Sequence, residues 1–378
     1  MASIGSNHIR FNRPHICGKE IEYISEAMAN GVLSGNGPFT KKCHQYFESN
    51  YGFKKVLLTT SCTDALEMCA MLVNICPGDE VIVPSYTFVS SALAFHRAGA
   101  NIVFADSRAD HPGVDEKGIE ALITPKTKAI VFVHYAGIAC DMNIIMDIAQ
   151  RHSVYVIEDA AQAIDATYKG RPLGGIGHLA AFSFHETKNI ISGEGGMLVI
   201  NDDQFVHRAE ILWEKGTNRS SFFRGEVNKY GWIDTGSSFL PSELIAAFLY
   251  AQLENLGDIQ DNRLAVWNNY LSEFKRQAPK DIKLPFIPDF ASNNAHMFYI
   301  ICKDVDHRQG IINRLKQSGI SAVFHYLSLH SSPFYGQQNQ GLELVKSDEY
   351  SNCLLRLPLY YGLAPIEVAN IVSIICGE

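Results

Sequence analysis

Several features are missing from the 378-residue sequence, and each absence excludes a class of protein. The nine cysteines are scattered, odd in number and form no C-x-x-C pair, which favours reduced cytosolic thiols over disulfides or a zinc site. A formal net charge of −8 without a long Lys/Arg run argues against nucleic-acid binding. No apolar run approaches the length of a membrane span, and the first 13 residues contain no apolar signal core. These absences predict a soluble cytoplasmic protein with no membrane partner.

Two binding motifs are also absent or out of place. A Rossmann-type oxidoreductase needs a glycine-rich loop after its first strand, and the segment 59–64 contains no glycine. The glycines at 174–177 precede a predicted strand instead of following one, so they fail the same test. His325 and His330 lack a third ligand at a sensible spacing, and we therefore predict no metal site.

Strand-like and helix-like segments alternate through the first half of the chain. This alternation predicts an α/β fold whose mainly parallel sheet is covered on both faces. We expect a large domain over residues 1–255, including N-terminal helices, and a smaller α+β domain over 256–378. The predicted strands are 56–58, 80–83, 101–105, 129–133, 154–157, 181–184, 197–200, 296–301 and 321–324. Further expectations are a helix over 116–122, a long loop over 215–233 and a helix break near Gly257.

Lys188 is the centre of the candidate site. It follows a short aromatic strand and precedes a turn that contains Gly193, Gly195 and Gly196. Partial burial on such a connection disfavours the ammonium form and makes a nucleophilic amine accessible, as a Schiff-base lysine requires. Taken alone, the pattern is equally typical of a surface lysine after a strand.

Two further motifs support the interpretation of Lys188 as a Schiff-base lysine. Residues 59–63 place hydroxyls and backbone N–H groups at a predicted helix start, which suits a phosphate but also describes a plain N-cap. Asp159 ends a buried strand 29 residues before Lys188, where it either pairs with a pyridine nitrogen or caps the next helix. The sequence therefore predicts pyridoxal phosphate as cofactor, because a phosphate-binding segment, an aspartate and a lysine follow one another in this order at one edge of the sheet.

Other side chains after predicted strands are weaker candidates for the same site. Gln162 is placed to reach the 3′ oxygen of the cofactor. Phe88 either stacks on the cofactor ring or is a core aromatic. His134 either bonds near the ring or sits satisfied in the wall of the site.

The chain resembles the DegT/DnrJ/EryC1/StrS aminotransferases, within the aspartate aminotransferase fold (fold type I). The resemblance runs from Phe11 to about Leu359, and its specific motifs are 158–162, 182–189 and 194–196. Within this family the chain is most similar to the transaminases that make dTDP-4-amino-4,6-dideoxygalactose for enterobacterial surface glycans. That closeness rests on segments 84–89, 134–137, 215–220 and 294–299.

The resemblance implies a role for each candidate. Lys188 forms the Schiff base and moves the substrate proton, whereas relatives that dehydrate the sugar at C3 carry histidine in its place. Asp159 binds the pyridinium nitrogen, Gln162 the 3′ oxygen, and Phe88 stacks on the ring. The implied phosphate ligands are Ser61, Cys62 (through its backbone), Thr63, Ser183 and, from the partner chain of a homodimer, Ser238 where the family usually has asparagine.

The implied reaction moves an amino group from L-glutamate, which becomes 2-oxoglutarate, to C4 of dTDP-4-keto-6-deoxyglucose through pyridoxamine phosphate. The galacto product is favoured. Alternatives are the gluco epimer, amination at C3, or a non-catalytic regulator on the same fold, against which Lys188 and Asp159 argue. The candidates for substrate contact are His134, His185, Arg219, Arg224 and His325, with the two arginines also candidates for contact with the dimer partner.

Overall fold

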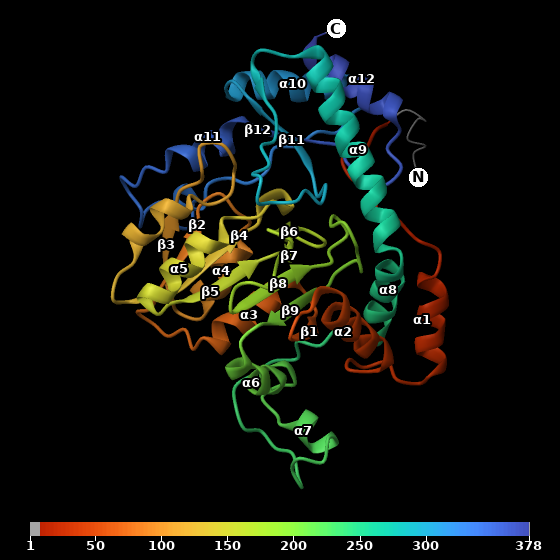
Figure 1. The fold of residues 1–378 in the computed structure, drawn as a ribbon, viewed down its shortest axis with the longest axis vertical. Helices are drawn as coiled ribbons and strands as arrows, with labels where there is room; N and C mark the ends of the chain where they lie inside the picture. The colour runs from red at the N-terminus through yellow and green to blue at the C-terminus, as the bar shows by residue number, and fades with distance from the viewer. Residues whose placement is uncertain (1–7, 378) are drawn as a thin grey trace.

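The computed structural model describes residues 8–377 and is built around a seven-stranded sheet (Figure 1). The strand order is β1-β9-β8-β5-β4-β2-β3. Neighbours from β3 to β8 are parallel, whereas β9 runs antiparallel to both β8 and β1, so the predicted mainly parallel sheet is confirmed. The strands are β1 (Lys55–Thr59), β2 (Glu80–Pro84), β3 (Asn101–Ala105), β4 (Thr127–Val133), β5 (Tyr155–Asp159), β8 (Leu179–Ser183) and β9 (Gly196–Ile200).

Helices cover both faces of this sheet, which explains why its strands are nearly continuous apolar runs. One face packs against α3 (Cys62–Leu72), α4 (Ser90–Arg97) and α6 (Asp203–Trp213). The other packs against α2 (Pro38–Tyr51), α5 (Met142–His152) and α8 (Glu243–Glu254). Trp213 fixes α6 to the sheet, because its indole N–H donates a 2.6 Å hydrogen bond to the carbonyl of Leu58.

The start of α2 depends on a residue two hundred positions away. Its N-cap, Gly37, has no side chain to bond the free N–H groups of the first turn. The fully buried carboxylate of Glu243 accepts hydrogen bonds from the N–H groups of Gly37, Phe39 and Thr40, at 3.0, 2.7 and 3.0 Å. Glu243 therefore joins α2 to α8, and α1 (Glu20–Ala29) packs against α8.

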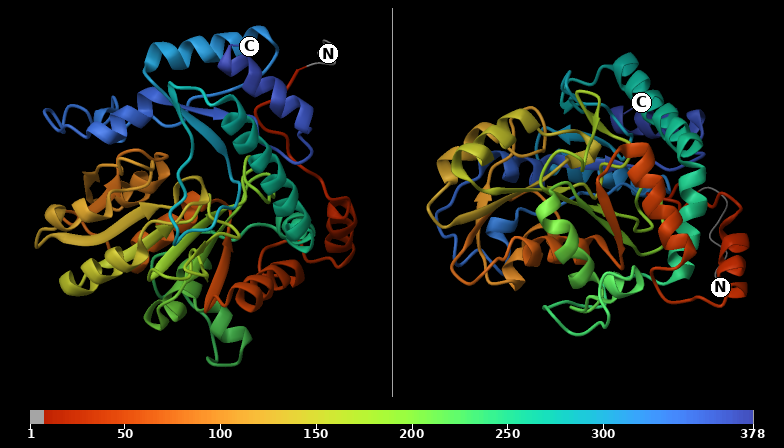
Figure 2. Two further views of the ribbon diagram at one scale, coloured as in Figure 1. Left: turned by 45° about the horizontal axis from the view of Figure 1, so that its top comes forward. Right: turned by 60° about the horizontal axis from the view of Figure 1, so that its bottom comes forward.

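A smaller three-stranded antiparallel sheet is formed by β10 (Ile282–Lys283), β11 (Phe298–Cys302) and β12 (Leu354–Leu357). Its core is aromatic and includes Phe298, whose ring centroid lies 4.9 Å from that of Tyr270. The long helix α9 extends α8 upward alongside this sheet (Figures 1 and 2). The helices here are α9 (Leu256–Gln277), α10 (Val305–Gln317), α11 (Val345–Cys353) and α12 (Pro365–Cys376). The proposed division at residue 255 falls between α8 and α9, and it stays a prediction.

Two local expectations were wrong. Residues 116–122 form two 3-10 turns, Glu116–Gly118 and Glu120–Leu122, because Glu116 turns inward and accepts a 2.6 Å hydrogen bond from the N–H of Asp141. The expected strand over 321–324 is reduced to a single bridge between Val323 and Arg356. The predicted helix break near Gly257 is confirmed and lies two residues earlier, at Asn255, while Gly257 itself is inside α9 at a cost of about 1 kcal/mol relative to alanine.

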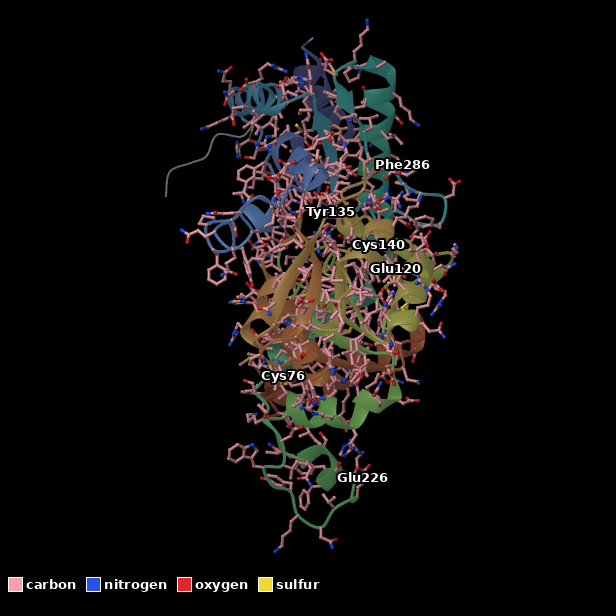
Figure 3. The ribbon with its side chains drawn as sticks, turned by 90° about the vertical axis from the view of Figure 1, so that its left-hand side faces the viewer. Cys76, Glu120, Tyr135, Cys140, Glu226 and Phe286 are labelled. Atoms are coloured by element: carbon pink, nitrogen blue, oxygen red, sulfur yellow. The ribbon has the colours of Figure 1, made fainter. Side chains whose placement is uncertain are left out.

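The predicted loop over 215–233 projects from the body of the molecule and contains a short helix, α7 (Arg219–Phe223) (Figures 1 and 2). Glu226, labelled in Figure 3, belongs to this segment. Large apolar side chains are exposed on it, with Phe223 69% and Trp232 84% accessible. In the part of the chain described, none of the helices has the length and apolar character needed to span a membrane.

Candidate active site

The carboxyl ends of β1, β2, β4, β5 and β8 lie at one edge of the large sheet, and most of the predicted site residues follow them. Asp159 is the last residue of β5 and is aligned with Val133 of β4 and Ala181 of β8. Its side chain is only 4% exposed. Ser91 donates a 2.6 Å hydrogen bond to Asp159 Oδ2, and the N–H of Ala161 donates one of 3.1 Å to Oδ1.

A positive charge beside Asp159 would stabilise its ionised form. Burial raises the pKa of this carboxyl, and the hydrogen bond from Ser91 and the positive charge of Lys188 oppose the rise. A protonated ring nitrogen placed against Asp159 adds a nearby positive charge and keeps the carboxylate ionised. The carboxylate in turn keeps that nitrogen protonated, as a pyridine-type cofactor needs.

Gly196 lies between the two segments that are predicted to bind the phosphate. It is paired with Thr59 at the end of β1 and with Ser183 at the end of β8. A Cβ atom at Gly196 would lie 2.3 Å from the carbonyl carbon of Ser61 and 2.4 Å from the nitrogen of Cys62. The backbone at the start of α3 therefore crosses directly over Gly196, close to Ser183.

The donors of this predicted phosphate cradle are mainly backbone groups. Ser61 is the N-cap of α3, and its hydroxyl exchanges hydrogen bonds with Asp64, accepting from its N–H at 3.1 Å and donating to its carboxylate at 3.0 Å. The N–H groups of Cys62 and Thr63 lie in the first helical turn, where no intrahelical acceptor exists. Together with the Thr63 and Ser183 hydroxyls, these groups are suited to bind an anion at the positive end of a helix.

Lys188 lies on the connection between β8 and β9, at the same edge as Asp159. Its N–H donates a 2.9 Å hydrogen bond to the carbonyl of His185, and the side chain is half-buried. Burial lowers the pKa of Lys188, against the opposing influence of Cys62 and Asp159. The lysine is therefore easier to deprotonate than a surface lysine, as its proposed chemistry requires.

Asn189 fixes the lysine connection, a role that the sequence analysis did not predict. Its side-chain amide donates to Gln260 Oε1 and to the carbonyl of Asn294, both at 2.8 Å. Its oxygen lies 2.8 Å from Nδ1 of His296. Lys188 is thereby tied to α9 and to the segment that leads into β11, so it is held from outside its own sheet.

Tyr326 links the predicted ring contacts. Its hydroxyl accepts a 2.9 Å hydrogen bond from the Gln162 amide, and its ring centroid is 6.1 Å from that of Phe88. Phe88 is 56% exposed, which excludes the core-aromatic alternative. The Tyr135 hydroxyl lies 2.7 Å from Nδ1 of His325, which stacks on Tyr326. Figure 3 shows Tyr135 between the large sheet and the β11–β12 region.

His134 belongs to the wall of the site, and a substrate contact is not supported. Its ring is completely buried, with Nε2 2.9 Å from Glu158 and Nδ1 accepting from the N–H of Cys140. The same glutamate accepts hydrogen bonds from the N–H groups of Gly174, Ile176 and Gly177. The glycine loop that superficially resembled a phosphate loop therefore binds a carboxylate of its own chain.

The remaining predicted residues lie at the periphery. His185 is half-exposed and bonds Thr187 at 2.9 Å. Arg219 and Arg224 belong to the projecting segment, where Arg224 is paired with Glu210 and Glu226 at 2.8 and 2.6 Å. Ser238 is exposed. The structure thus assembles the cofactor candidates of one chain but does not bring these two arginines to the same edge.

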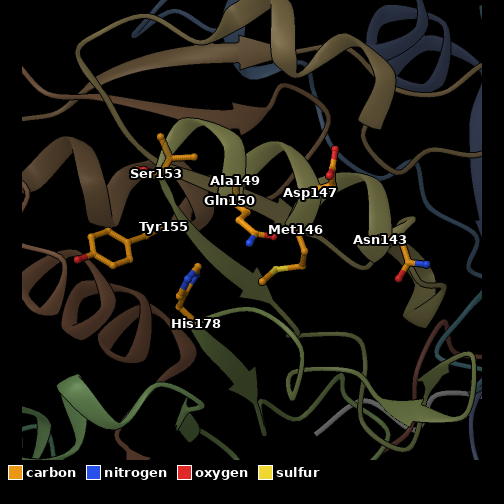
Figure 4. A pocket seen from close by; sticks show the side chains of 9 residues that line it. Asn143, Met146, Asp147, Ala149, Gln150, Ser153, Tyr155 and His178 are labelled. Atoms are coloured by element: carbon orange, nitrogen blue, oxygen red, sulfur yellow. The ribbon is translucent and has the colours of Figure 1, made fainter.

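A hollow of about 620 Å³ lies elsewhere on the described surface (Figure 4). It is lined by residues of α5 together with Tyr155 and His178, at the amino ends of β5 and β8. None of the predicted site residues lines it. Lys188 instead borders a much smaller hollow with Arg13 and Arg263.

A family model described as the DegT/DnrJ/EryC1/StrS aminotransferase family matches residues 14–376. The chain belongs to this family. It is 32% identical, over 97% of its length and 96% of the relative, to the spore coat polysaccharide biosynthesis protein SpsC of Bacillus subtilis. The putative sugar aminotransferase Spr1654 of Streptococcus pneumoniae, solved in a pyridoxamine phosphate form, is 26% identical with a TM-score of 0.89 over 97% of this chain and 98% of that one.

DesV of S. venezuelae is similar to the same extent, with 28% identity and a TM-score of 0.88 over 98% of both chains. Membership of the family makes this chain an aminotransferase that uses pyridoxal phosphate. The residues present fit that cofactor. Asp159 is a buried carboxylate suited to the ring nitrogen, and a Cβ at Gly196 would displace the backbone at Ser61 that forms the phosphate cradle. When bound, the cofactor supplies an electron sink for the carbon being aminated.

Proposed function

We propose that this DegT/DnrJ/EryC1/StrS family member transfers the amino group of L-glutamate to C4 of dTDP-4-keto-6-deoxyglucose, giving the galacto product. The observation that carries the reaction type is the position of Lys188 and Asp159 at one sheet edge, near enough to affect each other's pKa, where burial lowers the pKa of the lysine. The likeness to a polysaccharide biosynthesis protein and to a sugar aminotransferase supports a sugar acceptor made for a surface glycan. The nine free thiols fit a reducing compartment such as the cytoplasm.

Lys188 carries the proton transfers of the proposal. Its neutral amine would remove the proton from Cα of glutamate, and release of 2-oxoglutarate would then need a water molecule to hydrolyse the C=N bond. In the second half-reaction its protonated form would deliver a proton to C4 of the sugar. A single lysine with a lowered pKa serves both as base and as acid, so no second titrating group is required.

The other residues bind and orient. Asp159 would hold the ring nitrogen, Gln162 the 3′ oxygen, and Phe88 would stack on the ring. Backbone N–H groups of Cys62 and Thr63 would hold the phosphate, together with the hydroxyls of Ser61, Thr63 and Ser183.

A homodimer completes the proposed site. The projecting segment exposes Phe223 and Trp232, and burial of such side chains against a second copy would be favourable. Ser238 lies at the base of this segment and would contribute to the cofactor phosphate of the partner copy. Arg219 is the better candidate for a nucleotide diphosphate, since its nearest carboxylate is 4.0 Å away, whereas Arg224 is already paired twice. His185 and His325 remain candidates for substrate contact.

An absorbance spectrum tests the proposal directly. We expect a visible band from cofactor bound to Lys188, lost on addition of L-glutamate and restored by dTDP-4-keto-6-deoxyglucose. Lys188→Ala should show neither change. NMR of the product separates the galacto product from the gluco epimer and from amination at C3. Loss with glutamate but no restoration by this sugar would discard the acceptor and keep the reaction type.

A further inference from the structure

A short segment crosses from the small sheet to the end of β2 and carries Tyr326. Val323 anchors its first end, because it exchanges backbone hydrogen bonds of 2.9 and 3.1 Å with Arg356 of β12. Three residues later, the Tyr326 hydroxyl accepts a 2.9 Å hydrogen bond from the Gln162 amide. We name residues 324–328 the crossing segment. The position of Tyr326 therefore depends also on the anchor at the other end of this segment.

The second anchor is Ser85, the residue directly after β2. It is completely buried, and its N–H donates a 2.9 Å hydrogen bond to the carbonyl of Ala105 at the end of β3, so it continues the sheet. Three hydrogen bonds join Ser85 to the 3-10 turn Leu329–Ser331. Its carbonyl accepts from the N–H of Leu329 at 3.0 Å, and its hydroxyl accepts from the N–H of His330 at 3.3 Å. The same hydroxyl lies 2.7 Å from Nδ1 of His330.

The surroundings of His330 give its bond with Ser85 a direction. The Ser85 hydroxyl already accepts from the backbone of His330, so its own proton is free for the ring nitrogen. On the other side of the ring, Nε2 lies 3.7 Å from Oδ2 of Asp348, where a proton on Nε2 faces a carboxylate. The neutral ring with its proton on Nε2 has Nδ1 as acceptor. Ser85 therefore donates to His330, and we name this pair the clasp.

The clasp lies at the root of two side chains of the candidate site. Ser85 begins the turn that leads to Phe88, three residues further along the chain. His330 follows the crossing segment, which carries Tyr326. The ring centroids of Phe88 and Tyr326 are 6.1 Å apart. One buried anchor thus sets the separation between the predicted ring-stacking residue and the residue that contacts Gln162.

The amide of Gln162 is oriented by two contacts, and one of them depends on the clasp. Its Oε1 accepts a 2.6 Å hydrogen bond from the N–H of Ala136, which identifies the other end of the amide as the NH₂ group. One hydrogen of Nε2 is donated to the Tyr326 hydroxyl. The second hydrogen is left for another acceptor, and the 3′ oxygen of the cofactor is the acceptor proposed for it. A displaced Tyr326 would leave the amide without the contact that directs Nε2.

We propose that Ser85 and His330 are positioning residues that hold Tyr326 in place and thereby orient the Gln162 amide toward the 3′ oxygen of the cofactor. The inference rests on the proposed function and deepens it, because it assigns the orientation of a cofactor contact to a pair of residues outside the binding site. A hydrogen-bond donor stabilises the anionic form of the 3′ oxygen. The ionisation of the bound cofactor therefore reports the orientation of the amide.

The test measures, in the holoenzyme, the pH at which the visible cofactor band changes, because this midpoint follows the ionisation of the bound cofactor. Ser85→Ala removes the clasp hydroxyl, and His330→Phe removes its acceptor. His330→Asn restores an acceptor, since its Oδ1 takes the place of Nδ1. Tyr326→Phe removes the hydroxyl that the clasp holds in place. Ser331→Ala is the matched control, because the Ser331 hydroxyl donates to the carbonyl of Ser328 at 3.2 Å in the same turn.

We expect Tyr326→Phe to raise this midpoint by about 0.5–1 pH unit, because the anionic 3′ oxygen loses part of its stabilisation. Ser85→Ala and His330→Phe should raise it by a similar amount, whereas His330→Asn and Ser331→Ala should stay close to wild type. Because the clasp acts through Tyr326, the double variant Ser85→Ala/Tyr326→Phe should show no larger shift than Tyr326→Phe alone.

An unchanged midpoint in Ser85→Ala, beside a raised one in Tyr326→Phe, would overturn the inference and keep the proposed function. Additive shifts in the double variant would also overturn it, since the clasp would then act by another route. An unchanged midpoint in Tyr326→Phe would overturn the inference together with the role proposed for Gln162, whereas a wild-type protein without a visible band would overturn the proposed function itself. Thermal melting of each variant separates a shifted band from a lost fold.

Discussion

Ser91 and Asp159 form a buried pair in which the serine hydroxyl donates a 2.6 Å hydrogen bond to a carboxylate that is 4% exposed. The pair joins the first turn of α4 to the end of β5, so it fixes the carboxylate from a helix on one face of the sheet. This bond lowers the pKa of Asp159, whereas burial raises it. The ionised state of Asp159 therefore depends on Ser91.

Ser91→Ala should weaken cofactor binding. Without the hydroxyl the pKa of Asp159 rises further, and the carboxylate binds a protonated ring nitrogen less well. A hydrogen bond to a charged group is worth enough to raise the Kd for pyridoxal phosphate about tenfold, measured by titrating the apoenzyme. Thr87→Val is the control, since Thr87 lies 2.9 Å from Ser91 and does not contact Asp159. Equal Kd values for Ser91→Ala and Thr87→Val would contradict the prediction.

Gly196→Ala should damage the phosphate cradle. The added methyl group would lie 2.3–2.4 Å from the backbone of Ser61 and Cys62, and backbone at this distance has to move. We expect the Kd for the cofactor to rise by at least about tenfold, because the N–H groups that face the phosphate are displaced.

Gly257→Ala is the matched control for Gly196→Ala. It lies inside α9 with no atom within 4 Å of the new methyl group. Alanine favours the helix by about 0.5–1 kcal/mol, so this variant should melt at a slightly higher temperature and keep its cofactor affinity. A Gly196→Ala protein that binds cofactor as tightly as Gly257→Ala would refute the crossing at Ser61 as a functional feature.

Glu243→Ala should lower the free energy of unfolding more than the removal of a helix-capping carboxylate at the surface does. It leaves the N–H groups of Gly37, Phe39 and Thr40 buried without an acceptor, and we expect a loss of about 3 kcal/mol or more in the free energy of unfolding. Glu367→Ala, which removes a single 2.9 Å bond at the start of α12, should cost about 1 kcal/mol. Denaturant unfolding measures both, and similar losses would show that Glu243 does not hold α2 on α8.

His44 should make the stability of the fold depend on pH. Its Nε2 accepts a 2.9 Å hydrogen bond from the N–H of Leu58, and burial lowers the pKa of His44 to about 3. As pH falls below about 6.5, the imidazole of His44 is protonated in the unfolded chain, whereas in the folded chain it stays neutral until about pH 3. The stability that neutral His44 provides is therefore present above pH 6.5 and lost between these values.

The variant His44→Gln isolates this contribution. Between pH 6 and pH 4, the unfolding free energy of the variant should fall less steeply with decreasing pH than that of wild type. The difference between the two slopes should be about 1.4 kcal/mol per pH unit. Urea unfolding at several pH values gives the two slopes. Identical slopes for wild type and His44→Gln would mean that this ring is protonated in the folded protein.

The sheet was predictable from the sequence because each strand is a short apolar run between polar turns. Asp159 is the clearest case, since a carboxylate directly after a buried strand must lie at the sheet edge. The segment 116–122 was mispredicted because its helical spacing did not reveal that Glu116 is drawn inward by Asp141. The site roles assigned to Lys188, Asp159 and the phosphate ligands stay predictions, although the structure places them at one edge.

Residues that act through long-range contacts could not be predicted from the sequence. Asn189 is recognised only because α9 and the segment before β11 meet it, and Tyr326 only because it reaches Gln162. His134 had the right position along the chain, and its burial against Glu158 was visible only in three dimensions.

Glu158 and Asp159 are consecutive carboxylates with separate tasks. The pleat of β5 sends one to the glycine loop and His134 and the other to Ser91 and the lysine connection. Inserting or deleting one residue in this strand would exchange the two without changing a single side chain's chemistry. During divergence, β5 is therefore expected to tolerate substitution far better than any change of length, so an alignment gap inside it would mark a relative that has lost the site.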